Sequence, residues 1–243
     1  MARRRFFVRA VRNGRAELTG EAAEHLRRVL RAEAGQRFEI SDNHVVYLAE
    51  IEELSKGLVL FSVIEQMEAE SPEMRLILLA SLIKFDRFEW IVEKATELGV
   101  EDFIPVVSER SETGLSEAAP RRLERWRRIA LESSQQSRRA RLPEIRECLP
   151  LERALTVGGD FHYLLEEECS APPILATLPE AAQRLPAHAV CLLVGPEGGW
   201  TDRERQAAKA GGWLPVSLGP RILRSETAAL AAVAVLVSAW REP

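Results

Sequence analysis

Hydrophobic and polar residues follow two different patterns along the chain, and the pattern changes near residue 70. Before this point, short segments alternate between apolar and polar residues, which predicts strands with one buried face. Apolar residues at helical spacing predict one helix in this part, over residues 21–31. The expected strands begin at Phe6 and continue at 36–40, 44–51 and 58–64. This order predicts a small β-barrel domain over residues 1–70.

A polar segment with one proline, residues 68–73, is the expected linker to the second part. The run 74–83 that follows is continuously apolar, as a strand covered on both faces requires. Strands and helices then alternate, which predicts an α/β domain with a mainly parallel sheet over residues 74–243. Further strands are expected at 103–107, 161–167, 189–194 and 214–218, and helices at 84–100, 120–137, 201–210 and 225–240.

Two of these strands end in loops that contain glycine and proline. The loop after 189–194 reads GPEGG (195–199), and the loop after 214–218 reads GPRILRSET (219–227). Glycines let a ligand approach the main chain closely, and open α/β sheets bind ligands beyond the carboxyl ends of their strands. Each loop alone could be an ordinary strand-to-helix turn. Their repetition predicts one small-molecule site, built largely from the backbone of two adjacent loops.

Each loop leads into an expected helix, and the two helices differ in character. Thr201 and Glu204 have the spacing of a capping box that starts the helix 201–210, and Gly211 is expected to end it. The helix 225–240 is apolar on nearly every side. It should therefore be buried, either in the core or against another subunit.

Charge is distributed unevenly. The net charge of −4 argues weakly against indiscriminate nucleic-acid binding, yet arginines cluster at residues 3–15 and again at 121–141. Arginine makes bidentate contacts with phosphates and stacks on bases. Either cluster alone could equally be a solvated face.

Several other features restrict the class of protein. No apolar run reaches the length of a membrane span, and the N-terminus lacks the apolar core of a signal segment. Cys148, Cys169 and Cys191 lack the spacing of a metal site or a disulfide framework, and the four histidines are scattered. We therefore expect a cytoplasmic protein without a metal and without a membrane anchor.

Taken together, the motifs resemble the RsmE family of the SPOUT superfamily, which methylates N3 of a uridine in 16S ribosomal RNA of the small subunit. The similar segments include RRRFFV at the N-terminus, HLRRVLR (25–31), Lys84 with EKATELGV (93–100) and Pro105, and QQSRRARLPEI (135–145). LLVGPEGGW and LGPRILRSETA complete the set, and at this separation they are its most specific members.

This resemblance implies a PUA-like β-barrel domain for RNA binding over residues 1–70. It also implies a SPOUT-type α/β methyltransferase domain over 74–243 with a C-terminal trefoil knot, a feature that spacing alone could not indicate. The implied cofactor is S-adenosylmethionine, and the implied partners are small-subunit ribosomal RNA or the assembled 30S subunit and a second copy of the chain. The implied cofactor-binding residues are Leu193, Val194, Gly195, Pro196, Glu197, Gly198, Gly199, Leu218, Gly219, Ile222, Leu223, Arg224, Thr227 and Ala228.

Methylation of uracil N3 requires loss of the N3 proton and stabilisation of the negative charge that remains. Arg224 and Arg139 are the candidates for contacting the charged uracil. Glu197 is a third catalytic candidate, as a base, although the favoured role for its carboxylate is to order the loop. The residues expected to contact RNA are Arg3, Arg4, Arg5, Arg9, Arg27, Arg121, Arg122, Arg125, Arg138 and Arg139.

Two positions depart from the family pattern. Gln135 stands where glutamate is common and cannot serve as a base, and Arg138 stands where a small residue is usual. Ser225 replaces a threonine but keeps the hydroxyl group. Two other functions are left open: a ribose 2′-O-methyltransferase of the same superfamily, and an RNA-binding or assembly protein that keeps the fold without catalysis.

Overall fold

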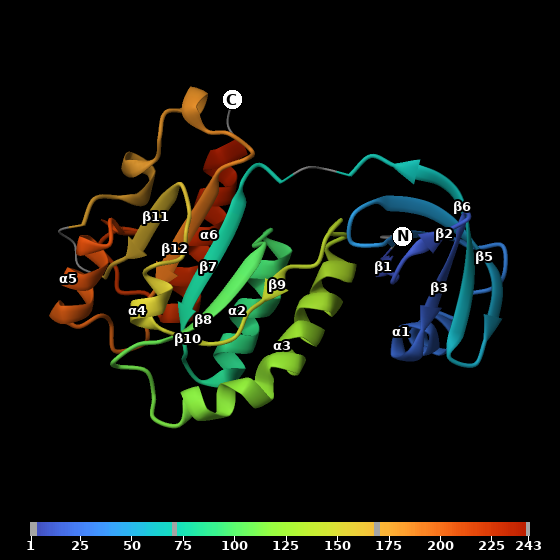
Figure 1. Ribbon diagram of the computed structural model, residues 1–243, viewed down its shortest axis with the longest axis horizontal. Coiled ribbons are helices and arrows are strands. Elements are labelled where there is room, and N and C mark those ends of the chain that lie inside the picture. Colours follow the sequence, from blue (N-terminus) through green and yellow to red (C-terminus); the bar gives the residue numbers. More distant parts are fainter. Residues whose placement is uncertain (1–3, 70–71, 168–170, 242–243) are drawn as a thin grey trace. The chain divides into compact units, whose positions relative to one another are not determined.

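The computed structural model describes residues 4–69, 72–167 and 171–241, which form two compact units (Figure 1). One unit contains the residues before the linker together with Leu131–Leu142, and the other contains the rest. The segment Leu131–Leu142 lies far from the N-terminal part in sequence. Its place in the first unit depends on hydrogen bonds with residues about 100 positions away, for example Ser41 Oγ to the Ala140 carbonyl at 2.6 Å.

The first unit is built on a six-stranded sheet in the order β1-β4-β5-β6-β3-β2. β1 and β4 are parallel and the other pairs are antiparallel. The predicted helix is confirmed as α1, Gly20–Glu24, which continues as a π-helical turn over His25–Val29. The strands are β1 (Arg5–Phe7), β2 (Val11–Arg12), β3 (Arg15–Thr19), β4 (Arg37–Ser41), β5 (Val46–Ser55) and β6 (Leu58–Met67). Sheet and helix enclose a core of their own around Phe6, Leu26 and Phe61.

The second unit contains a parallel sheet in the order β10-β8-β7-β12-β11-β13, with β9 paired to β8. The prediction of a mainly parallel sheet is therefore confirmed. Its strands are β7 (Arg75–Ser81), β8 (Asp102–Val107), β9 (Glu144–Ile145), β10 (Leu149–Pro150), β11 (Phe161–Leu165), β12 (Ala189–Val194) and β13 (Leu214–Val216). The helices are α2 (Phe85–Glu97), α3 (Leu115–Gln136), α4 (Leu151–Ala154), α5 (Asp202–Ala210) and α6 (Ser225–Arg241), with short 3-10 turns at Ile174–Thr177 and Ala181–Gln183.

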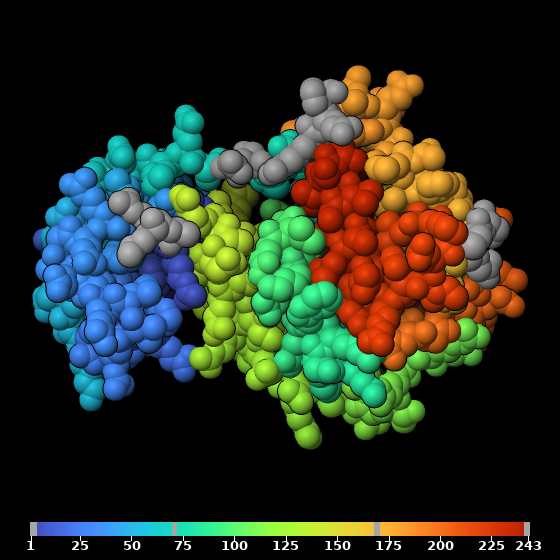
Figure 2. All heavy atoms as spheres, turned by 180° about the vertical axis from the view of Figure 1, so that it is seen from behind, coloured from blue at the N-terminus to red at the C-terminus, as the bar shows by residue number. Residues whose placement is uncertain are grey.

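Helices cover both faces of this sheet. Alternate residues of its central strands point to opposite faces, and both sets are apolar and buried. Leu192 of β12 joins a core shared with α2, α3 and α6, while the next residue, Leu193, joins a core shared with α4 and α5. The apolar helix α6 buries Ala229, Val233 and Leu236 completely. The helix lies beside α2, and both are visible on the surface seen from behind (Figure 2).

The start of α5 has the predicted local chemistry. Thr201 caps the helix by accepting a hydrogen bond from the Glu204 amide at 3.3 Å, and the Glu204 carboxylate accepts one from the Thr201 amide at 2.8 Å. This capping box confirms the predicted start of the helix. Gly211 is the C-cap, so the predicted end is confirmed as well.

Candidate functional site

The two glycine-bearing loops follow strands that are not neighbours in the sheet. β11 lies between β12 and β13 and pairs with both in parallel, so the carboxyl ends of three strands meet at one edge. The two loops therefore flank the end of β11, and Leu165, Glu166 and Glu167 at that end line the same site as both loops. Strand order depends on pairing between distant segments, so no local pattern could indicate it.

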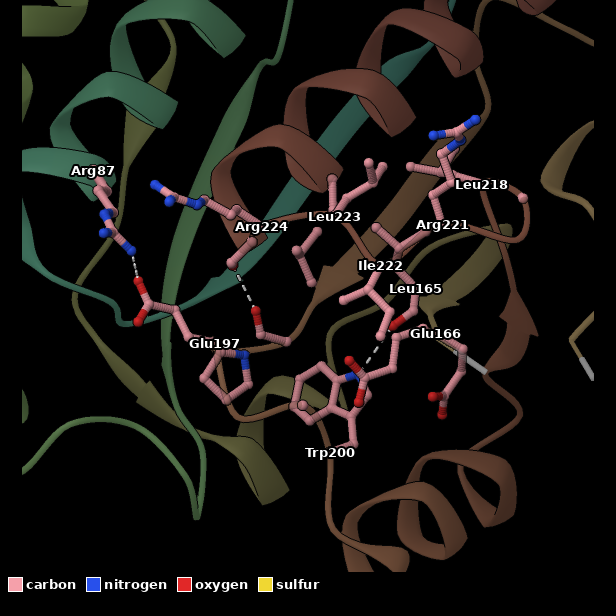
Figure 3. A pocket seen from close by; sticks show the side chains of 18 residues that line it. Arg87, Leu165, Glu166, Glu197, Trp200, Leu218, Arg221, Ile222, Leu223 and Arg224 are labelled. Carbon is pink, nitrogen blue, oxygen red and sulfur yellow. Dashed lines mark hydrogen bonds and ion pairs between the residues drawn. The ribbon is translucent and has the colours of Figure 1, made fainter. Parts of the chain in front are cut away.

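A cavity of about 350 Å³ lies at this edge of the sheet (Figure 3). It is lined by most of the predicted cofactor-binding residues, namely Val194, Gly195, Pro196, Glu197, Gly199, Leu218, Gly219, Ile222, Leu223, Arg224 and Ala228. Three residues of the predicted set, all within the described part of the chain, are outside the lining: Leu193, Gly198 and Thr227. Leu193 points into the core on the α5 side of the sheet, and Thr227 is exposed on α6.

Other lining residues were missed by the sequence analysis. They are Arg87, Leu165, Glu166, Glu167, Trp200, Arg221 and Ser225. Arg221 and Ser225 lie within the predicted loop 219–227, and the others except Arg87 directly follow the first loop or lie at the end of the predicted strand 161–167, so proximity in sequence could have found them. Arg87 is different, because it belongs to α2 and had no local signal that connected it with the loops.

Gly195 and Gly199 are required by their surroundings. A Cβ atom on Gly195 would lie 3.0 Å from the ring of Trp200, which is 2% exposed. Gly199 has φ +67°, and a Cβ there would lie 2.5 Å from Glu167 Oε1. Larger residues at these positions would therefore displace the loop or its neighbours.

The loop after β12 is held by hydrogen bonds from several elements. Ser225 at the start of α6 donates from Oγ to the Gly195 carbonyl at 2.7 Å. Arg110 donates to the Gly198 carbonyl at 2.6 Å. Trp200 donates from Nε1 to the Leu165 carbonyl at 3.0 Å and thereby ties the loop to β11. These bonds indicate a largely preformed cavity.

Charged side chains gather on one side of the cavity. Arg87 forms an ion pair with Glu197, and Arg224 lies on the same side (Figure 3). The sequence predicts two alternative roles for Glu197, as a base or as a residue that orders its loop. Its carboxylate is held by the guanidinium of Arg87, as a role in ordering the loop requires.

Arg139, the other catalytic candidate, lies in the first unit, whereas Arg224 and Glu197 lie in the second. Its Nε donates to the Arg141 carbonyl at 3.1 Å. Gln135 also belongs to the first unit and is buried.

Two of the predicted RNA-contacting arginines share one buried carboxylate within the first unit. Arg5 donates from Nη2 to Glu39 Oε2 at 2.9 Å, and Arg138 forms a second ion pair with the same carboxylate. Glu39 is 5% exposed and Arg5 is 8% exposed. Arg5 therefore has little surface left for a phosphate, whereas about half of the Arg138 side chain is accessible.

The remaining predicted arginines lie mainly on the surface. Arg4, Arg9, Arg27, Arg121 and Arg125 are exposed. Arg122 stacks on the Phe85 ring at 4.9 Å and shares Glu89 with Arg125. Arg3 lies outside the described residues.

The described residues offer neither a grouped set of metal ligands nor a membrane-spanning helix. In residues 4–69, 72–167 and 171–241, no three histidine, cysteine or carboxylate side chains are grouped so that they could hold a metal ion. Over the same described residues, every helix is too short or too polar to cross a membrane.

Comparison with known proteins gives matches over both parts of the chain. The family model for an RNA methyltransferase domain matches residues 69–237, and that for an RNA methyltransferase PUA domain matches residues 18–64. The Ribosomal RNA small subunit methyltransferase E of Synechocystis sp. is 38% identical over 89% of this chain and 71% of its own length. The Ribosomal RNA small subunit methyltransferase E of Bacillus subtilis is 32% identical over 90% of this chain and 88% of its own length.

Solved structures are similar over nearly the full length. A crystal structure of a Ribosomal RNA small subunit methyltransferase E from Neisseria gonorrhoeae bound to S-adenosyl methionine has a TM-score of 0.87, with 28% identity over 98% of both chains. A methyltransferase of Legionella pneumophila in complex with the same cofactor has a TM-score of 0.86, with 27% identity over 98% of both chains.

Proposed function

Because the chain belongs to the RNA methyltransferase family that contains the Ribosomal RNA small subunit methyltransferase E proteins, we propose that it methylates 16S ribosomal RNA with S-adenosylmethionine. The target atom in this proposal is N3 of one uridine. The observation that carries the proposal is the cavity built by the two glycine-bearing loops. The similar protein from Neisseria gonorrhoeae was crystallised with this cofactor.

The residues around the cavity suit S-adenosylmethionine. Its volume of about 350 Å³ is within the range of small-molecule sites. Leu165, Val194, Leu218, Ile222 and Leu223 offer apolar surface for an adenine ring, and Gly195 and Gly199 leave main-chain groups accessible. When bound, the cofactor supplies a methyl group on a positively charged sulfur. The carboxylate of Glu167 complements that positive charge, whereas Glu166 and Glu197 are paired with Arg205 and Arg87.

The chain's contribution to the reaction is to orient the uracil and stabilise its anion. The N3 edge is paired in a duplex, so the target uridine must be unpaired or flipped out of its helix. Arg224, at the cavity, would donate hydrogen bonds to the uracil carbonyl oxygens and thereby ease loss of the N3 proton. Arg139 is the second candidate for this contact. Glu197 orders its loop while paired with Arg87.

RNA binding would involve both parts of the chain. In this proposal the PUA-like domain, residues 1–70, contacts RNA through Arg4, Arg9 and Arg27, and Arg121, Arg122 and Arg125 of α3 contact further phosphates. Arg138, with its accessible side chain, is included. The substrate is small-subunit ribosomal RNA, free or in the assembled 30S subunit, which also implies a cytoplasmic location.

A homodimer and a knot complete the proposal for the domain 74–243. Leu230, Val235 and Val237 of α6 are only partly buried in the single chain, which supports a second copy packed there. The knot would be formed by the segment that leads from β13 into α6. Its support is the family membership together with the bond from Ser225 to the first loop.

The test is incubation of undermethylated 16S ribosomal RNA or 30S subunits with the protein and labelled S-adenosylmethionine, followed by nuclease mapping. We expect one labelled uridine with the methyl group on N3, and strong loss of turnover in Arg224→Ala. A methyl group on a ribose oxygen would instead establish the 2′-O alternative. If the protein failed to bind S-adenosylmethionine even at millimolar concentration, the non-catalytic alternative would replace the proposal.

A further inference from the structure

Arg87 connects the two loops of the cavity although it belongs to neither. It lies in the first turn of α2 and lines the cavity (Figure 3). Its guanidinium forms an ion pair with Glu197 in the loop after β12. Its Nε also lies 3.9 Å from Oε1 of Glu226, in the first turn of α6. One side chain from a third element therefore faces a carboxylate from each side of the site.

The environment of Glu226 explains why a cation is needed at this place. Glu226 is 8% exposed, and its Oε2 has no hydrogen-bond partner among the described residues. A buried carboxylate is costly unless it is paired or hydrogen-bonded. Arg87 is the cation that the structure places near it. Loss of Arg87 would leave Glu226 and Glu197 as uncompensated negative charges at the two loops.

Arg87 could act in two ways, either by holding the loops or by contacting the ligand itself. Both of its charged neighbours in the structure are protein carboxylates, Glu197 and Glu226, which favours the first way. The Arg87 side chain is 30% exposed and that of Glu197 is 45% exposed, so this pair is partly screened, whereas the Glu226 carboxylate is buried and depends more on the nearby cation. The main effect of the two ion pairs is on the position of the two loops relative to each other.

We propose that Arg87 is a positioning residue that holds the GPEGG loop and the start of α6 at the separation that the cofactor requires. The inference rests on the proposed function of the cavity as the S-adenosylmethionine site. Its physical basis is preorganisation: a site that is already arranged binds more tightly because less order has to be created on binding.

The experiment compares two ligands by calorimetric titration. S-adenosylmethionine carries a positively charged sulfonium and an amino-acid group with a carboxylate, whereas 5′-methylthioadenosine has the same nucleoside on a neutral thioether sulfur and lacks the amino-acid group. If Arg87 positions the loops, Arg87→Met lowers the affinity for both ligands by a similar factor. We expect about tenfold for a modest loss of preorganisation. Arg87→Lys, which keeps the positive charge, recovers most of the affinity for both.

Two controls accompany these variants. Arg127→Met removes an exposed arginine of α3 that pairs with Glu124, and its affinities should match the wild type. Arg87→Met should also reduce ligand affinity by a smaller factor in a Glu197→Gln background than in the wild type, because the ion pair between Arg87 and Glu197 is already absent there. Thermal unfolding of each variant confirms that the chain is folded before titration.

Three results would overturn the inference. The first is an unchanged affinity of Arg87→Met for both ligands. The second is a lower affinity for S-adenosylmethionine with an unchanged affinity for 5′-methylthioadenosine. The third is that the effects of Arg87→Met and Glu197→Gln on the free energy of binding are strictly additive in the double variant. The second result would make Arg87 a direct ligand contact. A wild-type protein that binds neither ligand would contradict the proposed function itself, so the two failures are distinguishable.

Discussion

The hydroxyl group of Ser225 donates a hydrogen bond of 2.7 Å to the carbonyl oxygen of Gly195. This bond joins the first residue of α6 to the loop after β12, across 30 positions of the sequence. Because β11 separates the strands that precede the two loops, no strand pairing connects them directly. The bond therefore links the two loops that line the cavity directly to each other.

Substitution of Ser225 tests this link. Ser225 is 7% exposed, so Ser225→Ala leaves the Gly195 carbonyl without its partner in a poorly hydrated place. We expect a loss of about 1–2 kcal/mol in the affinity for S-adenosylmethionine, which is roughly 5–30-fold in Kd. Ser225→Thr keeps the hydroxyl and should bind nearly as the wild type does. Equal affinities for Ser225→Ala and the wild type in calorimetry would contradict this role of the bond.

Gly195→Ala tests the packing of the loop on Trp200. The added methyl group would lie 3.0 Å from the ring, so the loop or the ring must move. We expect destabilisation of about 1–3 kcal/mol, together with weaker cofactor binding. Gly158→Ala is a matched control, because a Cβ at Gly158 has no neighbour within 4 Å. Urea unfolding and cofactor titration should separate the two variants, and similar behaviour would count against the packing argument.

The carboxylate of Glu39 should be important for the stability of the first unit. Glu39→Ala leaves the buried guanidinium of Arg5 without its ion pair, at a cost of about 3–5 kcal/mol. Hydrogen exchange at β1 and β4 measures this loss. Glu50→Gln, which breaks the exposed pair with Arg37, should change stability by less than about 0.5 kcal/mol.

Arg138→Gly should have a smaller effect than loss of Glu39. Arg138 has φ +58°, a left-handed conformation that glycine adopts without strain. The variant therefore relieves about 1 kcal/mol of backbone strain while it removes one of the two cations around Glu39. A destabilisation as large as that of Glu39→Ala would show that Arg138, rather than Arg5, dominates the cluster.

Cys191 is buried and Cys148 is partly buried, so both thiols should react slowly in the folded protein. Burial raises the pKa of Cys191 from its ordinary 9.0 to about 12, and that of Cys148 to about 11. Because the thiolate is the reactive form, a maleimide at about pH 8 should leave Cys191 unmodified until the protein unfolds. Site-resolved mass spectrometry measures this. Rapid labelling of Cys191 in the native state would contradict its burial.

The same shift has a consequence for stability at alkaline pH. The folded state holds the Cys191 proton more tightly than the unfolded state does. The contribution of the Cys191 thiol to the free energy of unfolding is therefore complete below pH 9.0. The contribution falls as the pH rises through 9.0 toward about 12. Cys191→Ala should therefore show a shallower decline in unfolding free energy over this range than the wild type.

Arg121 tests the proposed RNA surface of α3, where it is exposed. If Arg121 contacts a phosphate, Arg121→Ala lowers RNA affinity and reduces the slope of log K against log salt by about 0.7–0.9. Lys209→Ala removes an exposed cation from α5, outside the predicted RNA surface, and serves as the control. An unchanged slope in Arg121→Ala would remove this residue from the RNA surface.

The sequence by itself determined the elements of the fold and the chemistry of the two loops. Continuous apolar runs predicted β7 and β12, helical spacing predicted α2, and Thr201 with Glu204 predicted the start of α5. Such features depend on residues a few positions apart, because periodicity, caps and turns are local. The same loops indicated a small-molecule site, and the resemblance of the GPEGG and LGPRILRSETA segments to a known family identified most residues that line the cavity.

Only the tertiary structure decided how these elements combine. It placed β11 between β12 and β13, brought Arg87 to the cavity, and joined Leu131–Leu142 to the first unit. It also gave Arg138 its partner, since a carboxylate 99 positions away holds its side chain. Strand order and ion pairs depend on contacts between residues far apart in sequence. The free energy of those contacts exists only once the chain has folded, so no local pattern records them.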